Sequence, residues 1–237
     1  MYGQFKINHE RIVPKKLAIL PLIVYFYELF KKGIKFRHLD DMMVTPIRQY
    51  LILSQINDWN LQTIVNNFTK IIIDNSNNET GVFLLPLSEF IDFINQSQMR
   101  PTDISEARFI GYTWFALKIL TPERIYNFEP SSGGQFNPEI DHIFPYRLKG
   151  GDEYYKTTVD VLWNLQPITK EVNGFKLAEH PKVFFQSQTG VKYLQDYDFL
   201  PSKNLDDQIW DDPSQFIGKR RELMMEFFER KYGLKFI

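Results

Sequence analysis

The spacing of apolar residues changes near Asn127, and this change constrains the fold more than any other feature of the sequence. Between residues 15 and 125, apolar side chains recur every three or four positions, which is the period of a helix with one buried face. After Asn127 the apolar runs become short and β-like. The sequence therefore predicts an α+β fold that is mainly α. A helical scaffold or interaction region covers 1–125, and a second region with a small β core covers 126–237.

Turn and capping signals bound the helices that we expect. The polar stretch Asp74–Asn78 is predicted to end one helix, and Ser88 is a candidate N-cap of the next. The expected helices span Pro46–Ile56, Asn60–Ile72, Leu87–Ile94, a segment from Thr102 and Asp103 to Leu120, and a C-terminal helix over 213–232 whose pattern is strongest from Phe216 to Tyr232.

Composition limits the chemistry that this chain can support. It has 237 residues, a formal net charge of −1, no cysteine and four histidines. The missing cysteines exclude disulfides, thiolate zinc sites and cysteine nucleophiles. A nearly balanced charge means that contacts with phosphate would come from local basic patches or from a metal ion. The most apolar run, Leu17–Phe30, has 14 residues, fewer than the roughly 20 of a membrane span, and no signal peptide is evident. We therefore expect a cytoplasmic protein.

A strand–loop–strand–helix pattern follows Asn127. The expected strands are Pro138–Phe144 and Val159–Ile168, joined by a polar loop over Tyr146–Thr158. Thr169 is a good N-cap for a short helix from Lys170 to about Ala178.

Asp141, His142 and Asn173 in this core are the residue types that metal-assisted hydrolysis of a phosphodiester requires. Carboxylate and amide oxygens bind hard divalent cations, and an imidazole is a base near neutral pH. Neighbours in a regular strand face opposite sides, so Asp141 and His142 can converge only where the strand ends or bends, and Pro145 ends the ladder nearby. Asn173 would complete the metal site. Two oxygen ligands suit Mg²⁺ better than Zn²⁺.

Three motifs in this order, Asp141–Pro145, Asn164–Ile168 and Asn173–Lys176, resemble the HNH (His-Me finger) endonucleases, in which a β-hairpin and a helix hold one metal ion. The HNH domain of CRISPR effector nucleases has the same order of Asp-His, Asn and Asn, with the two asparagines nine positions apart as they are here. The Asp-His-Ile-Phe-Pro string, with Asn-Leu-x-Pro-Ile and Asn-x-x-Lys, is more similar to the C-terminal nuclease domain of GmrSD-type restriction endonucleases. The resemblance implies a ββα-metal core at about 138–180.

The resemblance also implies a role for each residue. His142 would be the general base that activates water, and Asp141 and Asn173 would hold one Mg²⁺ or Mn²⁺ ion. Asn164 would fix the loop that carries His142. Lys176 lies three positions after Asn173, on nearly the same helix face, and is expected to touch the scissile phosphate.

A metal-dependent endonuclease that nicks or cleaves DNA, in restriction or phage defence, is the implied function. Cutting of both strands by a homodimer stays open. Family members often carry a ParB-like nucleotide-hydrolysing domain with an Asp-Gly-Gln-Gln-Arg-type motif, which this sequence lacks, so a separate domain or subunit would supply it. Two alternatives remain: a DNA-binding scaffold with little catalysis, and an interaction subunit whose 1–125 region recruits the nucleotide-sensing partner.

Basic residues elsewhere are candidates for DNA contact, with an ordinary solvated surface as the alternative. Arg147 and Lys149 lie in the loop after His142, and Arg220 and Arg221 lie on the C-terminal helix. His180 is expected to be either a site residue or a helix-terminal residue. Trp163 is expected in the core. His9 and His38 have no companions at ligand spacing, so neither is assigned a role.

Overall fold

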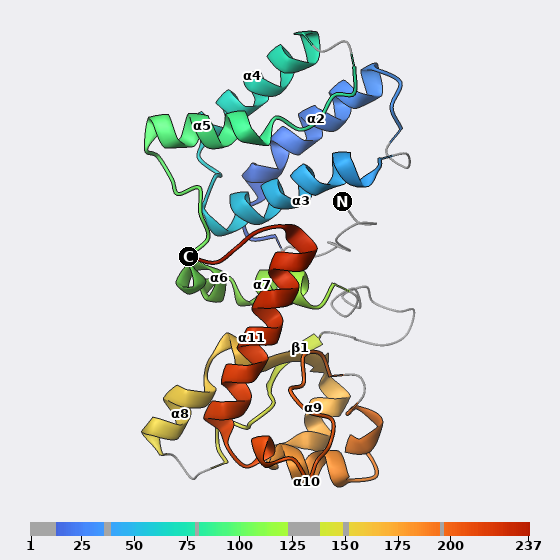
Figure 1. Cartoon of the computed structure of the whole chain (residues 1–237), viewed down its shortest axis with the longest axis vertical. Coiled ribbons are helices and arrows are strands. Elements are labelled where there is room, and N and C mark those ends of the chain that lie inside the picture. The colour runs from blue at the N-terminus through green and yellow to red at the C-terminus, as the bar shows by residue number, and fades with distance from the viewer. Residues whose placement is uncertain (1–12, 36–38, 79–80, 123–137, 149–151, 195–196) are drawn as a thin grey trace. The chain divides into compact units, whose positions relative to one another are not determined.

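A computed structural model describes residues 13–35, 39–78, 81–122, 138–148, 152–194 and 197–237 (Figure 1). The chain divides into two compact units. The helical unit comprises Val13–Tyr112 together with Glu229–Ile237, and the described part of the hairpin unit runs from Thr113 to Phe228. The expected boundary at 125 thus differs from this division, and the last residues of the chain belong with the helical unit.

The helical unit packs its helices around an aromatic core. The rings of Phe68 and Phe90 are stacked with centroids 4.2 Å apart, and Tyr50 contacts Phe68, Phe90 and Trp59. The Tyr50 hydroxyl donates to the Ala18 carbonyl at 2.7 Å, which satisfies the polar tip of a fully buried ring. The elements are η1 (Lys16–Ile19), α2 (Leu20–Lys31), α3 (Asp41–Ile56), α4 (Gln62–Asn78), α5 (Leu87–Ser97) and α6 (Glu106–Gly111).

The C-terminal segment closes the helical unit. Phe236 forms a parallel bridge with Ile104, and the Ile237 N–H donates to the Ile104 carbonyl at 3.0 Å. The Phe236 ring also meets the Phe109 ring edge-on, with centroids 4.9 Å apart. Residues more than a hundred positions apart therefore complete one core.

Three expectations for the helices in this part of the chain are wrong. Helix α4 continues through the polar Asp74–Asn78 stretch, because Ser76 donates to Glu28 at 2.9 Å and Asn75 donates to the Ile71 carbonyl. Helix α5 follows Pro86 and has no side-chain cap, so Ser88 does not have the expected role. The single helix expected from Asp103 to Leu120 is two helices, α6 and α7 (Thr113–Leu120), and Ser105 caps the first.

The hairpin unit contains a two-stranded antiparallel sheet among short helices. Strand β1 (Pro138–His142) pairs with β2 (Leu165–Thr169), and Asp141 lies opposite Gln166. The other elements are α7, α8 (Glu153–Val159), η3 (Leu162–Asn164), α9 (Lys170–Lys176), α10 (Pro181–Gln186), η4 (Gly190–Lys192), η5 (Gln208–Trp210) and α11 (Pro213–Tyr232). The described part of the chain is mostly helical with a small two-stranded antiparallel sheet, which is consistent with the expected α+β class.

Three expectations for the hairpin need correction. The Val159–Ile168 strand is wrong in its first half, where α8 ends and η3 follows, and β2 starts only at Leu165. The Tyr146–Thr158 loop contains α8, whose N-cap Asp152 accepts from the Tyr154 N–H at 2.9 Å. The first strand ends at His142, two residues before the predicted end.

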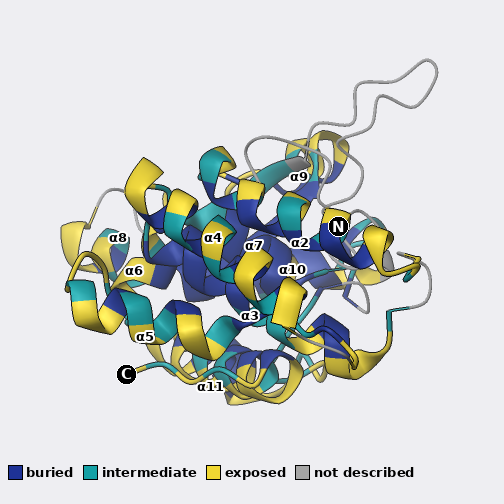
Figure 2. Ribbon diagram, turned by 90° about the horizontal axis from the view of Figure 1, so that it is seen from above, coloured by how far each residue is buried: buried dark blue, intermediate teal, exposed yellow. Residues whose placement is uncertain are grey.

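Helices α9 and α11 agree with their sequence signals. The Thr169 hydroxyl accepts from the Val172 N–H and caps α9 as expected. Helix α11 ends before Gly233, whose φ of +65° suits glycine. Phe216, Met224 and Phe228 on α11 are fully buried, and Figure 2 shows the same division of helices into buried and exposed sides. None of the helices in the described part of the chain combines the length and hydropathy that a membrane span requires.

Candidate active site on the hairpin

The register of the hairpin separates the two neighbouring residues of the central motif. Asp141 and His142 both belong to the β1–β2 ladder, opposite Gln166 and Leu165 respectively. Because successive residues of a strand face opposite sides, the two side chains leave β1 on different faces. Strand β1 ends at His142, as one of the two expected alternatives has it, but both residues keep their places in the ladder, which does not favour convergence of their side chains. Glu139, two positions before Asp141, shares its face.

Asp141 is buried and held by a lysine. Lys176 Nζ on α9 donates to Asp141 Oδ1 at 2.9 Å and to the His142 carbonyl at 2.6 Å, and the Tyr197 hydroxyl donates to Asp141 Oδ2 at 3.4 Å. Lys176 is fully buried and Asp141 is 5% exposed. The expected contact of Lys176 with a phosphate therefore needs correction, because its ammonium lies inside the unit.

Burial outweighs the attraction within this ion pair. Burial raises the pKa of Asp141, although Lys176 acts in the opposite direction. Burial likewise lowers the pKa of Lys176 against the effect of Asp141. Both shifts favour the neutral forms, so the cost of removing the two charges from water exceeds what the pairing returns. The position of the pair therefore depends on the surrounding fold, which keeps both side chains buried.

Asn173 and Lys176 form two parallel links from α9 to β1. Asn173 Nδ2 donates to Glu139 Oε2 at 2.7 Å, while Lys176 reaches Asp141. The spacing of three residues on the helix matches the spacing of two on the strand, so each helix residue meets one carboxylate. Sequence reasoning placed Asn173 and Lys176 on one helix face and missed Glu139. The signal for Glu139 was its position two residues before Asp141.

His142 meets a second carboxylate, Asp160, which sequence reasoning also missed. His142 Nε2 lies 2.9 Å from Asp160 Oδ1. The imidazole is 26% exposed and the Asp160 side chain is 61% exposed, so this pair lies at the surface. The Tyr146 ring lies near the imidazole, with ring centroids 6.0 Å apart and the planes tilted. Asp160 lay within the wrongly expected strand, which concealed its position at the C-terminal end of α8.

Asn164 is fully buried and uses both ends of its amide. Its Oδ1 accepts from the Phe144 N–H at 3.0 Å, and its Nδ2 donates to the Phe144 and Val159 carbonyls at 2.9 and 2.8 Å. Its backbone carbonyl also accepts from the Ile143 N–H at 2.9 Å. These bonds hold the segment directly after His142. This geometry agrees with the role that the resemblance implies for Asn164.

We expect Asn164→Ala to lower the free energy of unfolding by about 1–3 kcal/mol for each buried group that is left unsatisfied, because backbone groups of Phe144 and Val159 lose their partner. Asn173→Ala is the matched control, since this half-buried asparagine makes one side-chain bond to Glu139. The measurement is urea unfolding followed by tryptophan fluorescence. Equal losses in the two variants would contradict the assignment of Asn164 as the residue that holds this loop.

The candidate DNA contacts have different environments. Arg220 is fully buried, and its guanidinium donates to the Trp163 carbonyl at 2.6 Å, the Leu165 carbonyl at 3.0 Å and Gln166 Oε1 at 2.8 Å. The expectation that it contacts DNA therefore needs correction. Arg221 is half-buried and Arg147 is exposed in a turn after His142. Lys149 lies outside the described residues.

The other histidines and Trp163 have the following positions. His180 caps α10, since its Nδ1 accepts from the Lys182 N–H at 3.2 Å, and its ring meets Phe144 edge-on. Burial lowers the pKa of His180. This is the helix-terminal alternative considered for His180. Trp163 is 4% exposed, so its expected core position is confirmed. His9 and His38 lie outside the described residues.

A hard divalent cation would find oxygen donors on the α9 side of β1. Glu139 and Asp141 share that face and Asn173 meets it from α9. Within the described residues no group of three His, Asp or Glu side chains is arranged to hold a metal ion, so the Asn173 amide oxygen is needed as the third donor. These donors fit Mg²⁺ or Mn²⁺ in their chemistry. An ion bound there would have to displace the Lys176 ammonium from Asp141.

Comparison of the chain with protein-family models, with curated proteins and with solved structures found no match.

Proposed function

We propose that this protein is a metal-dependent HNH-type endonuclease that hydrolyses phosphodiester bonds in DNA, with His142 as general base. One observation carries the proposal. Asn164 on the hairpin ties down the segment after His142 through Phe144, and α9 with Asn173 follows directly on β2. The order of these elements along the chain and the contacts of Asn164 support the proposal, whereas Asp141, bound by Lys176, would have to change partners to hold an ion.

The partly exposed imidazole of His142 is the group that can reach a water molecule beside a bound DNA strand. His142 takes a proton from this water, and the oxygen attacks phosphorus while the bond from phosphorus to the 3′ oxygen breaks. The chemistry that Mg²⁺ or Mn²⁺ would supply, held by Asp141 and Asn173, is stabilisation of negative charge at phosphorus and at the departing oxygen. Exposed Arg147 follows His142 by five positions and is available to bind the strand.

The experiment is an assay of supercoiled plasmid with Mg²⁺ or Mn²⁺. The wild type is expected to give nicked or linear DNA, and His142→Ala is expected to lower the rate by roughly 10²–10⁴-fold, the usual contribution of a general base. His180→Asn is the matched control, because asparagine is also a good N-cap for α10 and His180 lies outside the proposed machinery. Full activity in His142→Ala would show that another residue is the base.

The same assay separates the proposal from the interaction-subunit alternative. It is run with the chain alone and with a nucleotide-hydrolysing partner of the ParB-like type plus nucleotide. Cleavage by the chain alone supports an autonomous nuclease, whereas cleavage only in the mixture assigns activation to the partner. We place the activity in restriction or phage defence, where a plaque assay with wild type and His142→Ala is the corresponding cellular test.

A further inference from the structure

We propose that Asp160 is a positioning residue that orients His142 and fixes which ring nitrogen carries the proton. The catalytic part of this inference rests on the proposed function, but the structural part does not. His142 Nε2 lies 2.9 Å from Asp160 Oδ1. An ionised carboxylate can only accept a hydrogen bond, so Nε2 of the neutral ring must be the donor. The lone pair is then on Nδ1, and this nitrogen is the one that can take a proton from water.

Asp160 is held in place through its backbone, although its side chain is largely exposed. Its N–H donates to the Lys156 carbonyl at 2.9 Å at the end of α8. The carbonyl of the preceding residue, Val159, accepts from Asn164 Nδ2 at 2.8 Å. These two hydrogen bonds fix the backbone at Asp160, and with it the position from which the side chain extends.

One buried amide sets the distance between the two partners. Asn164 binds Phe144, two residues after His142, and Val159, one residue before Asp160. The same side chain thus fixes the strand end that carries the base and the helix end that carries the carboxylate. Asn164 is fully buried, and the Tyr155 hydroxyl on α8 reinforces the link by donating to the Pro145 carbonyl at 3.1 Å.

Stability does not account for the His142–Asp160 pair. Ion pairs at the surface contribute little to folding, because water screens the charges and two side chains lose freedom. Asp160 also makes no side-chain cap within α8, whose N-cap is Asp152 at the other end. The remaining physical effect of the contact is on the ring of His142, namely its orientation and its tautomer. Partners of this kind typically change activity by roughly 10–100-fold in metal sites, where they orient a histidine ligand.

The test compares Asp160→Ala and Asp160→Asn with a control that removes the same charge from the same helix. Glu153→Gln is that control, because Glu153 is exposed on α8 and pairs with Lys156. Proton NMR of the full chain is expected to show a slowly exchanging His142 Nε2–H signal in the wild type and in Glu153→Gln. The signal should be lost in Asp160→Ala and retained in weakened form in Asp160→Asn, whose amide oxygen still accepts. The same signal in Asp160→Ala as in the wild type would overturn the proposal, whether or not the protein cuts DNA.

Kinetics then test the positioning role. In Asp160→Ala, kcat is expected to fall by roughly 10–100-fold with KM little changed, while the midpoint of urea unfolding stays at its wild-type value. Asp160→Asn should recover part of the rate, and Glu153→Gln should leave it unchanged. An unchanged kcat in Asp160→Ala, with the NMR signal lost, would refute the role in catalysis. An inactive wild type would instead overturn the proposed function, and the NMR result would still decide whether Asp160 holds His142.

Discussion

Replacing Arg220 by methionine is expected to lower the free energy of unfolding by about 3 kcal/mol or more, because several buried neutral acceptors each lose a hydrogen bond at a cost of about 1–3 kcal/mol. The Arg220 guanidinium is fully buried and joins α11 to the η3–β2 segment through the Trp163 and Leu165 carbonyls and Gln166 Oε1. Methionine fills much of the volume but donates no hydrogen bond. Gln166 would lose the donor to its Oε1. Its Nε2 has no hydrogen-bond partner among the described residues, so the whole buried amide would be left unsatisfied.

The controls for Arg220 come from the same position and the same helix. Burial lowers the pKa of Arg220 to about 9, so the guanidinium is still charged at neutral pH. Arg220→Lys is expected to rescue poorly, because one ammonium cannot match the fork of donors that reaches several acceptors. Lys219→Met changes the exposed neighbour, whose partner is Glu222, and should shift stability by no more than about 0.5 kcal/mol. Urea unfolding measures all three. Equal effects at 219 and 220 would show that the guanidinium network is unimportant for folding.

Replacing Lys176 by methionine is expected to cost about 3–5 kcal/mol as well, because Asp141 is left as a buried carboxylate without its ammonium. The Tyr197 hydroxyl at 3.4 Å is a weak substitute. The His142 carbonyl also loses its donor, which is 2.6 Å away in the wild type. Lys170→Met is the control on α9, since Lys170 is exposed.

A second substitution shows whether the charge of Asp141 causes the loss in Lys176→Met. Asp141→Asn alone leaves the Lys176 ammonium buried without a counter-charge, so it should also destabilise. The double variant removes both charges and is expected to recover about 0.5–3 kcal/mol relative to the sum of the single effects. This recovery follows from the burial of both groups, because each single change leaves one charge without its partner whereas the double change removes both. Strictly additive losses in urea unfolding would contradict this account of the pair.

Local signals in the sequence predicted much of the secondary structure. Thr169 at the start of α9 and Gly233 after α11 are capping signals that act within a few residues, so they can be recognised without a fold. Asp152 is an equally good cap for α8, but the helix is short and rich in tyrosine and threonine, which have low helix propensity. The β2 start was placed too early because Asn164 satisfies backbone groups that a strand would otherwise have paired.

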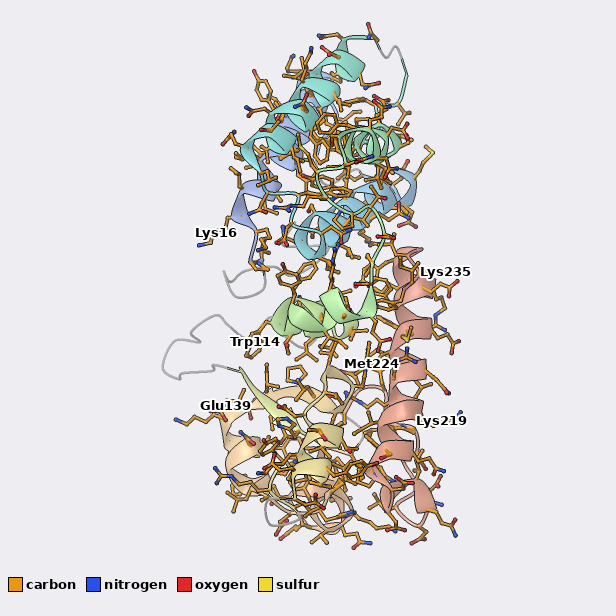
Figure 3. All side chains as sticks on the ribbon, turned by 90° about the vertical axis from the view of Figure 1, so that its left-hand side faces the viewer. Lys16, Trp114, Glu139, Lys219, Met224 and Lys235 are labelled. Atoms are coloured by element: carbon orange, nitrogen blue, oxygen red, sulfur yellow. The ribbon has the colours of Figure 1, made fainter. Side chains whose placement is uncertain are left out.

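The burial of Arg220 had a signal in the sequence that its basic neighbours concealed. Four residues of α11 recur at intervals of four and are all fully buried: Phe216, Arg220, Met224 and Phe228. This row is one face of a helix, so Arg220 belongs to the apolar side despite its charge. Lys219 and Met224, both labelled in Figure 3, mark the exposed and buried sides of α11. The direction of the helix face was predictable, whereas the acceptors that make burial of an arginine tolerable were not.

Contacts between elements were the least predictable part of the candidate site. The Asn-x-x-Lys spacing correctly placed Asn173 and Lys176 on one face of α9, but it contains no information on which strand residues they meet. Those partners, Glu139 and Asp141, depend on the hairpin register and on the turn between β2 and α9. The His142–Asp160 pair likewise depends on α8, which lay in an expected loop.

The closing contacts of Phe236 and Ile237 with Ile104 have a consequence for the nascent chain. Domains usually fold in order as they leave the ribosome, beginning with the N-terminal one. Here residues 13–112 emerge early, yet the segment that completes their core is translated only after the entire hairpin unit. The helical unit therefore lacks part of its core until residues 229–237 have been translated, and by then all of residues 113–228 have already been synthesised.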